Sequence, residues 1–180
     1  MNWPNRLSLL RVGLVPLVVL TICIGVPWSY GAALALFLAG CLTDWADGWM
    51  ARRYRIVTNF GKFMDPVADK LLVLSTMISL CGQGMIPAWT CVAVLFRELA
   101  VDGLRLVAVE QGKVIAAGKL GTIKTCTQMA MLVAYLLTAI GWLRVPVLNW
   151  ALLALAMAMT LWSGVDYFWK NRALFAGSLR

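Results

Sequence analysis

Acidic residues of the kind that bind metal ions or accept protons are concentrated in one short stretch of this sequence. Only eight Asp and Glu residues occur among its 180 residues, and four of them fall within DWADGWMARRYRIVTNFGKFMDPVAD, positions 44 to 69. These four are Asp44, Asp47, Asp65 and Asp69. The first two are three positions apart and the last two are four apart, so on helices each pair would project from one face.

Four ionised carboxylates brought together would repel one another unless a counter-charge is present. Hard divalent cations, which prefer oxygen ligands, supply that charge most simply, so the cluster predicts a metal site. The alternative is that these acids only cap or solvate helix ends. The chain contains no histidine, which is the commonest general base in proteins. Any proton transfer is therefore expected to involve a carboxylate, Lys, Tyr or Cys.

The composition predicts an all-α, polytopic membrane protein. Hydrophobic residues make up 62% of the chain and charged residues only 13%, where a soluble domain has roughly a quarter. The mean hydropathy is +0.81. Several apolar runs are long enough for a membrane-spanning helix, which takes about 20 residues. The five cysteines are scattered singly, so we expect them to be packing residues.

The apolar runs divide the chain into six expected transmembrane helices within a single domain, residues 1–180. A short N-terminal segment carrying Trp3, Arg6 and Arg11 is expected to lie at the membrane surface. The spans are expected at about residues 12–28, 31–53, 61–83, 86–109, 122–142 and 147–169. The second and third contain the acidic pairs, and charged side chains at membrane depth mark functional sites by default. The first span could also be a signal peptide, but the spans that follow favour a retained helix.

The distribution of Lys and Arg predicts the orientation in the membrane. With a cytoplasmic amino terminus, only Arg144 of the sixteen basic residues would lie in an outward-facing loop. This places the acidic cluster at the cytoplasmic face of the inner membrane. The net charge of +8 then reflects topology and anionic lipid rather than nucleic-acid binding. Interfacial anchors are expected near the span ends at Trp28, Trp89, Trp142, Trp150 and Trp169.

The acidic residues also form part of a longer pattern. It reads Asp44-x2-Asp47-Gly48-x2-Ala51-Arg52-x8-Gly61-x3-Asp65-x3-Asp69. This pattern resembles the signature of the CDP-alcohol phosphotransferase family, without a departure at any fixed position. The stretches NWPNRLSLLRVGLVP, FRELAVDGLR and GTIKTCTQM are similar to the phosphatidylglycerophosphate synthase branch of that family.

The resemblance implies a transferase that moves the phosphatidyl group of CDP-diacylglycerol to an alcohol and releases CMP. For the branch, the acceptor would be sn-glycerol 3-phosphate and the product phosphatidylglycerophosphate. The same machinery with phosphatidylglycerol (giving cardiolipin) or an inositol phosphate as acceptor is an alternative. A homodimer is implied by the family. A divalent-cation or proton-coupled transporter is a more distant alternative, because the acids gather at one face and no internal repeat is visible.

The resemblance also assigns roles to residues. It implies that Asp44, Asp47, Asp65 and Asp69 hold two divalent ions, Mg²⁺ or Mn²⁺. CDP-diacylglycerol would be bound by Asp44, Asp47, Gly48, Ala51, Arg52, Thr58 and Gly61. The two glycines would let the nucleotide approach the helix backbones, although close helix packing also explains them. Arg52 could equally be a membrane anchor. Asp69 is the expected general base, with metal ligation alone as the alternative.

A phosphorylated acceptor needs cations near the metal site. Arg97, Arg105 and Lys124 are the candidates, since the branch has basic residues at matching positions. The alternative is pairing within the helix, for instance of Glu98 or Asp102 with Arg105. One departure stands out: related synthases read Gly-Lys-x-Lys-Thr where this chain has Gly121-Thr122-Ile123-Lys124-Thr125. Lys119 is a candidate substitute for the lysine missing at Thr122.

Overall fold

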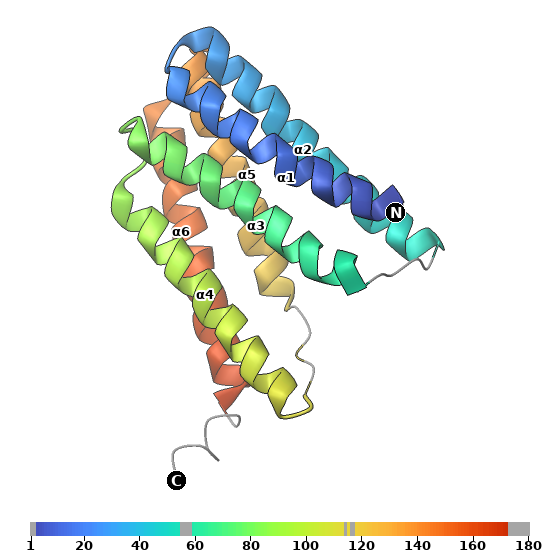
Figure 1. The fold of residues 1–180 in the computed structure, drawn as a ribbon. Coiled ribbons are helices and arrows are strands. Elements are labelled where there is room, and N and C mark those ends of the chain that lie inside the picture. The colour runs from blue at the N-terminus through green and yellow to red at the C-terminus, as the bar shows by residue number, and fades with distance from the viewer. Residues whose placement is uncertain (1–2, 55–58, 114, 116–117, 173–180) are drawn as a thin grey trace. The chain divides into compact units, whose positions relative to one another are not determined.

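In a computed structural model of the chain, helices are the only regular secondary structure among the residues that it describes, which confirms the predicted all-α class (Figure 1). The described backbone comprises residues 3–54, 59–113, 115 and 118–172. Within the helices, the side chains of residues 3–6, 45, 47–54, 59–63 and 65 are outside the description. The helices are α1 (Trp3–Ile24), α2 (Pro27–Tyr54), α3 (Asn59–Gly82), α4 (Ala88–Glu110), α5 (Lys119–Ile140) and α6 (Pro146–Lys170).

Most helix boundaries agree with the predicted spans, but the beginning of the chain differs. The sequence predicts a separate interfacial segment over residues 1–11, whereas α1 is one continuous helix from Trp3 onward. The first turn also comes earlier than expected. Gly25, with a φ of 75° that suits glycine, ends α1, and Pro27 occupies the favoured position at the start of α2.

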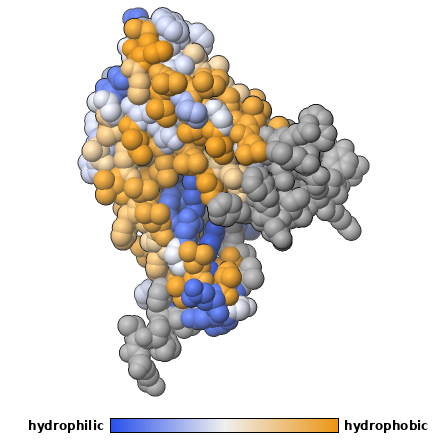
Figure 2. Space-filling model, in the orientation of Figure 1, coloured by the Kyte–Doolittle hydropathy of each residue, from blue (hydrophilic) through white to orange (hydrophobic). Residues whose placement is uncertain are grey.

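Three helices in the described part of the chain are long and apolar enough to cross a membrane. They are α1 over Leu7–Ile24, α5 and α6. Charged side chains interrupt the apolar character of α2, α3 and α4, so six spans remain a prediction. Apolar side chains cover much of the described surface in Figure 2, and Leu20, Phe96 and Leu106 are among the most exposed. Such exposure would be costly in water and fits contact with lipid.

By its internal contacts, the chain divides into two compact units. The first comprises Met1–Pro87 and Leu132–Val145, and the second comprises Ala88–Met131 and Pro146–Arg180. The single domain expected from the sequence stays a prediction.

In the first unit, α1 packs along both α2 and α3 (Figure 1). One face of α1 supplies the buried residues Ser8, Arg11, Val18 and Ile22, whose spacing follows the helical repeat. Two of these four are polar. The inner face of α1 is therefore not uniformly apolar, and its polar part lies in the half of the helix nearer the amino terminus.

A small residue lets α2 approach α3 closely. A Cβ atom built on Gly40 would lie 2.6 Å from Cδ2 of Leu72, closer than side chains tolerate. Gly40 precedes Asp44 by one helical turn, and Leu72 follows Asp69 by nearly one turn. The close contact between the two helices therefore lies next to both acidic positions.

The second unit is built on the pair α4 and α6, which lie side by side in Figure 1. Val101, Leu104 and Ala108 of α4 form a buried cluster with Tyr167 of α6. The first half of α5 is tied to α6 by a buried hydrogen bond, in which Nε2 of Gln128 donates to Oγ1 of Thr160 at 3.0 Å. Both α4 and the first half of α5 are thus fixed against α6.

Replacing Gly40 by Leu is expected to lower the melting temperature of the detergent-solubilised protein, since overpacking costs about 1–3 kcal/mol. Adding Leu72→Ala should recover part of that loss by vacating the space. Gly31→Leu on the same helix is the matched control, because a Cβ there meets nothing within 4 Å. Equal melting temperatures for Gly40→Leu and the control would refute the close contact.

Candidate active site

Asp44 on α2 and Asp69 on α3 come from the two helices that meet at Gly40 and Leu72. The Asp44 side chain is 45% exposed, whereas Asp69 is partly buried. The helices that carry these two of the four predicted metal ligands thus make a close contact within one turn of each of them.

For the other predicted residues of this site, the structure describes at most the backbone. Asp47 lies in α2 and Asp65 in α3, as the spacing predicted. Their side chains are outside the described residues, as are those of Gly48, Ala51, Arg52 and Gly61, and Thr58 lies outside altogether. Among the side chains that are described, no three Asp, Glu or Cys groups come together. The four-carboxylate cluster stays a prediction.

Arg11 supplies a positive charge to the acidic site. Its Nη1 lies 2.8 Å from Oδ1 of Asp44, which links α1 to α2. The Arg11 side chain is completely buried. The sequence placed Arg11 at the membrane surface; that prediction is wrong, because the residue falls on the inward face of α1 defined by Ser8, Val18 and Ile22.

The chemistry of the donor set suits a hard divalent cation. All four predicted ligands are carboxylates, and oxygen ligands are those that Mg²⁺ and Mn²⁺ prefer. Asp44 keeps almost half of its side-chain surface accessible although it pairs with Arg11. The described residues thus fit a metal site in which Asp44 is shared between Arg11 and a cation.

A second group of charges lies in the other unit, around Glu98 of α4. Its Oε1 accepts a hydrogen bond from Nζ of Lys124 on α5 at 2.5 Å and another from Nη1 of Arg97 at 3.1 Å. Glu98 and Lys124 are buried, and the Arg97 side chain is only 11% exposed. The structure therefore brings together two of the three cations predicted to bind the acceptor phosphate.

Arg105, the third predicted cation, has a different partner. Its Nε donates to the hydroxyl of Tyr167 on α6 at 3.0 Å, and its guanidinium lies 5.6 Å from the centre of that ring. Arg105 is seven residues, or about 10 Å along the helix, from Glu98. The tyrosine holds Arg105 on the side of α4 that faces α6.

Lys119 and Thr122 both lie exposed in the first turn of α5. Residues three apart lie on the same face of a helix, so Lys119 presents its amine one turn before the position where related synthases have lysine. This arrangement is compatible with the predicted substitution. Lys124, by contrast, is buried against Glu98.

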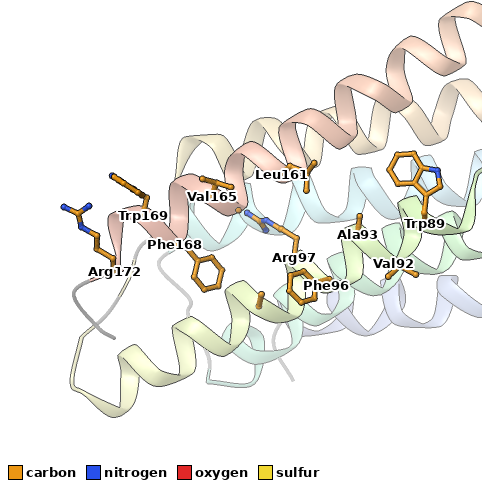
Figure 3. Close-up of a pocket in the computed structure, with 12 residues that line it drawn as sticks. Trp89, Val92, Ala93, Phe96, Arg97, Leu161, Val165, Phe168, Trp169 and Arg172 are labelled. Carbon is orange, nitrogen blue, oxygen red and sulfur yellow. The ribbon is translucent and has the colours of Figure 1, made fainter. Parts of the chain in front are cut away.

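An apolar groove of about 1010 Å³ runs between α4 and α6 (Figure 3). Its walls are formed by Trp89, Val92, Ala93, Phe96, Arg97, Ala100, Leu161, Gly164, Val165, Phe168, Trp169 and Arg172. Arg97 reaches from α4 toward α6, where Gly164 leaves it room: a Cβ on Gly164 would lie 3.2 Å from Cγ of Arg97. The lining suits hydrocarbon chains better than a polar ligand.

Comparison with known proteins places these features in a family. The family described as CDP-alcohol phosphatidyltransferase matches residues 1–162. The chain belongs to this family. The resemblance inferred from the aspartate pattern is thereby confirmed.

Individual relatives match along nearly their whole length. The CDP-diacylglycerol–glycerol-3-phosphate 3-phosphatidyltransferase of Bacillus subtilis (strain 168) is 40% identical over 184 residues, which cover 94% of this chain and 95% of the relative. The protein of the same name from Pseudomonas fluorescens is 37% identical over 175 residues, covering 93% and 88%. That from Shigella flexneri serotype 5b (strain 8401) is 38% identical over 179 residues, covering 96% of each.

For this family member, sequence reasoning missed two residues that the structure connects to the predicted site. Arg11 could have been found from its position, since it repeats with Ser8, Val18 and Ile22 along one face of α1. Glu98 was considered only as a partner for Arg105 within α4. Its contact with Lys124 crosses from one helix to another, and no spacing rule along a single helix predicts such a pair.

The ion pair between Arg11 and Asp44 predicts unequal effects of removing one charge or both. Asp44→Asn should lower the melting temperature in the presence of a chelator, because a fully buried guanidinium loses a counter-charge that contributes about 1.5–3 kcal/mol. Adding Arg11→Met should recover stability, since the buried guanidinium that lost the Asp44 charge is then removed as well.

Asp166→Asn is the matched control for this pair. Asp166 forms an ion pair with Lys170 at the same distance of 2.8 Å, but the lysine is 68% exposed, and such surface pairs contribute little. A thermal denaturation series in which Asp44→Asn and Asp166→Asn lose the same stability, or in which Arg11→Met deepens the loss, would contradict the ion pair.

Proposed function

We propose that this protein transfers the phosphatidyl group of CDP-diacylglycerol to sn-glycerol 3-phosphate, giving phosphatidylglycerophosphate and CMP. The observation that carries the proposal is the match to relatives named for this reaction over almost the full length of both chains. Membership of an enzyme family also favours a transferase over the transporter that the sequence left open.

In this proposal the CDP-diacylglycerol is bound at the acidic positions of α2 and α3. Asp44, Asp47, Asp65 and Asp69 would hold two divalent cations, Mg²⁺ or Mn²⁺. Gly48, Ala51, Arg52, Thr58 and Gly61 would contact the liponucleotide, as the family pattern implies. When bound, the cations would supply charge stabilisation for the diphosphate and for the departing CMP.

The chemical step is a displacement at the phosphorus that carries the diacylglycerol. The acceptor hydroxyl oxygen forms a bond to that phosphorus as the bond to the CMP oxygen breaks. Asp69 takes the hydroxyl proton, since the family resemblance points to this residue and a carboxylate is a natural general base in a chain without histidine. CMP leaves with the bonding electron pair, and the lipid product keeps the phosphorus.

The acceptor is recognised through its phosphate by Arg97, Arg105 and Lys124. The hydrogen bonds of Arg97 and Lys124 to one oxygen of Glu98 support a role for these two as a pair. The hydrogen bond from Arg105 to Tyr167 would orient a third cation. These charges favour a phosphorylated acceptor over a neutral alcohol.

We further propose that the enzyme is a homodimer in the inner membrane with its active site at the cytoplasmic face. The confinement of nearly all Lys and Arg residues to the cytoplasmic loops and helix ends supports the orientation. The exposure of Trp28, Trp89, Trp142, Trp150 and Trp169 is compatible with interfacial anchoring. The family resemblance supports the dimer.

Purified protein in detergent is expected to release CMP from CDP-diacylglycerol when glycerol 3-phosphate is present, and the lipid product should have the mass of phosphatidylglycerophosphate. Excess chelator should abolish turnover and Mg²⁺ or Mn²⁺ should restore it, because four carboxylates without counter-charge repel one another. Phosphatidylglycerol and inositol phosphate serve as competing acceptors in the same assay.

Each outcome of this assay decides a separate part of the proposal. Full turnover in excess chelator would refute the metal site. Turnover with phosphatidylglycerol or inositol phosphate but not with glycerol 3-phosphate would refute the acceptor while leaving the transferase intact.

Asp69→Asn separates proton transfer from binding. The amide keeps the size of the side chain and one oxygen, but it cannot accept the hydroxyl proton, so turnover should fall by about 10²–10⁴. Binding of CDP-diacylglycerol, measured by isothermal titration calorimetry, should change far less. A variant with near-normal turnover would show that Asp69 is not the base.

A further inference from the structure

Glu98 joins two cations through a single atom. Both Nζ of Lys124 and Nη1 of Arg97 donate to the same carboxylate oxygen, Oε1, at 2.5 and 3.1 Å. Because the two contacts share one oxygen, the separation of the two cationic nitrogens cannot exceed the sum of these distances. They therefore lie close enough to bind one phosphate together.

Two buried cations at such a separation would repel each other strongly in the absence of an anion. The Glu98 carboxylate offsets that repulsion. Arg97, Lys124 and Glu98 together still carry a net charge of +1, so they attract an anion. A cluster built in this way can be stable when empty and can still accept a phosphate.

The three side chains are also held from outside the cluster. Arg97 passes over Gly164 of α6, which has no side chain to displace it. Lys124 lies one turn before Gln128, whose hydrogen bond to Thr160 fixes that part of α5 against the same helix. Since α6 supports the elements that carry both cations, their spacing is set before any ligand arrives.

We propose that Glu98 is a positioning residue for the acceptor phosphate. It holds Arg97 and Lys124 side by side, so that they bind a phosphate monoester as a pair. The proposal rests on the transferase function proposed above and adds to it the residue through which acceptor affinity is set. Glu98 acts through the two cations and is not expected to touch the substrate itself.

The test is the kinetics of Glu98→Gln, which keeps the shape of the side chain and removes its charge. The Michaelis constant for glycerol 3-phosphate should rise about tenfold or more, the effect of losing a charge-assisted contact. The constant for CDP-diacylglycerol should not change, and turnover at saturating acceptor should change by less than about threefold. Glu110→Gln, an exposed glutamate at the end of the same helix, is the matched control and should behave as wild type.

A second background shows whether Glu98 works through its partner. In a Lys124→Met protein the pair of cations held by Glu98 is already lost. Adding Glu98→Gln should therefore raise the Michaelis constant for glycerol 3-phosphate by less than about twofold further. The double variant should also be at least as thermally stable as Lys124→Met alone, because it no longer buries a carboxylate that has lost this partner. Glu98→Asp, which keeps the charge, should restore part of the acceptor affinity.

Several outcomes would overturn the proposal. One is an unchanged or lower Michaelis constant for glycerol 3-phosphate in Glu98→Gln. Another is an equal effect of Glu98→Gln in the wild-type and Lys124→Met backgrounds. A third is a similar rise in the Michaelis constants for both substrates, which would indicate only a folding defect. If Glu98→Gln is not recovered folded, Glu98→Asp in the two backgrounds gives the same comparison. Failure of the transferase proposal is recognised separately, because wild-type protein would then not turn over glycerol 3-phosphate at all.

Discussion

A charge placed inside apolar helices needs an opposite charge beside it, and this constraint governs both parts of the molecule. In the first unit the fully buried Arg11 lies against Asp44. In the second, Glu98 lies against Arg97 and Lys124. An unpaired charge in such surroundings would cost several kcal/mol, so each partner keeps the other in place. Each group includes residues for which the family resemblance predicts a role: Asp44 in the first, and Arg97 and Lys124 in the second.

The two groups of charges have complementary signs. The predicted site on α2 and α3 is acidic, and Arg11 offsets only part of its charge, which leaves it suited to divalent cations. The group around Glu98 has an excess positive charge, which suits an anion. In the proposed phosphatidyl transfer, the acidic site would bind the diphosphate of one substrate through divalent cations, and the group around Glu98 would bind the phosphate monoester of the other. The exposed apolar side chains of the same helices are compatible with a reaction whose donor and product are lipids.

The sequence was sufficient for the fold class, for most helix boundaries and for the family. Long apolar runs and the 3.6-residue repeat determine which segments are helical, and the aspartate spacing is a local property of α2 and α3. The burial of Arg11 and the contact between Glu98 and Lys124 depend on which helices become neighbours. Periodicity identifies the face of a helix that is buried but not the residue opposite it, so Arg11 was placed at the surface and Glu98 was compared only with charges of its own helix.

The most direct test of the account is the number of divalent ions that the purified protein binds. Mn²⁺ binding, followed by electron paramagnetic resonance in the presence of CDP-diacylglycerol, should saturate at about two ions per chain, the number expected for a two-metal site. Asp44→Asn and Asp65→Asn, one on each helix, should each weaken or remove at least one of them. If no Mn²⁺ is bound even at high Mn²⁺ concentration, or if neither substitution changes the binding, the assignment of the aspartates as the metal site would be contradicted.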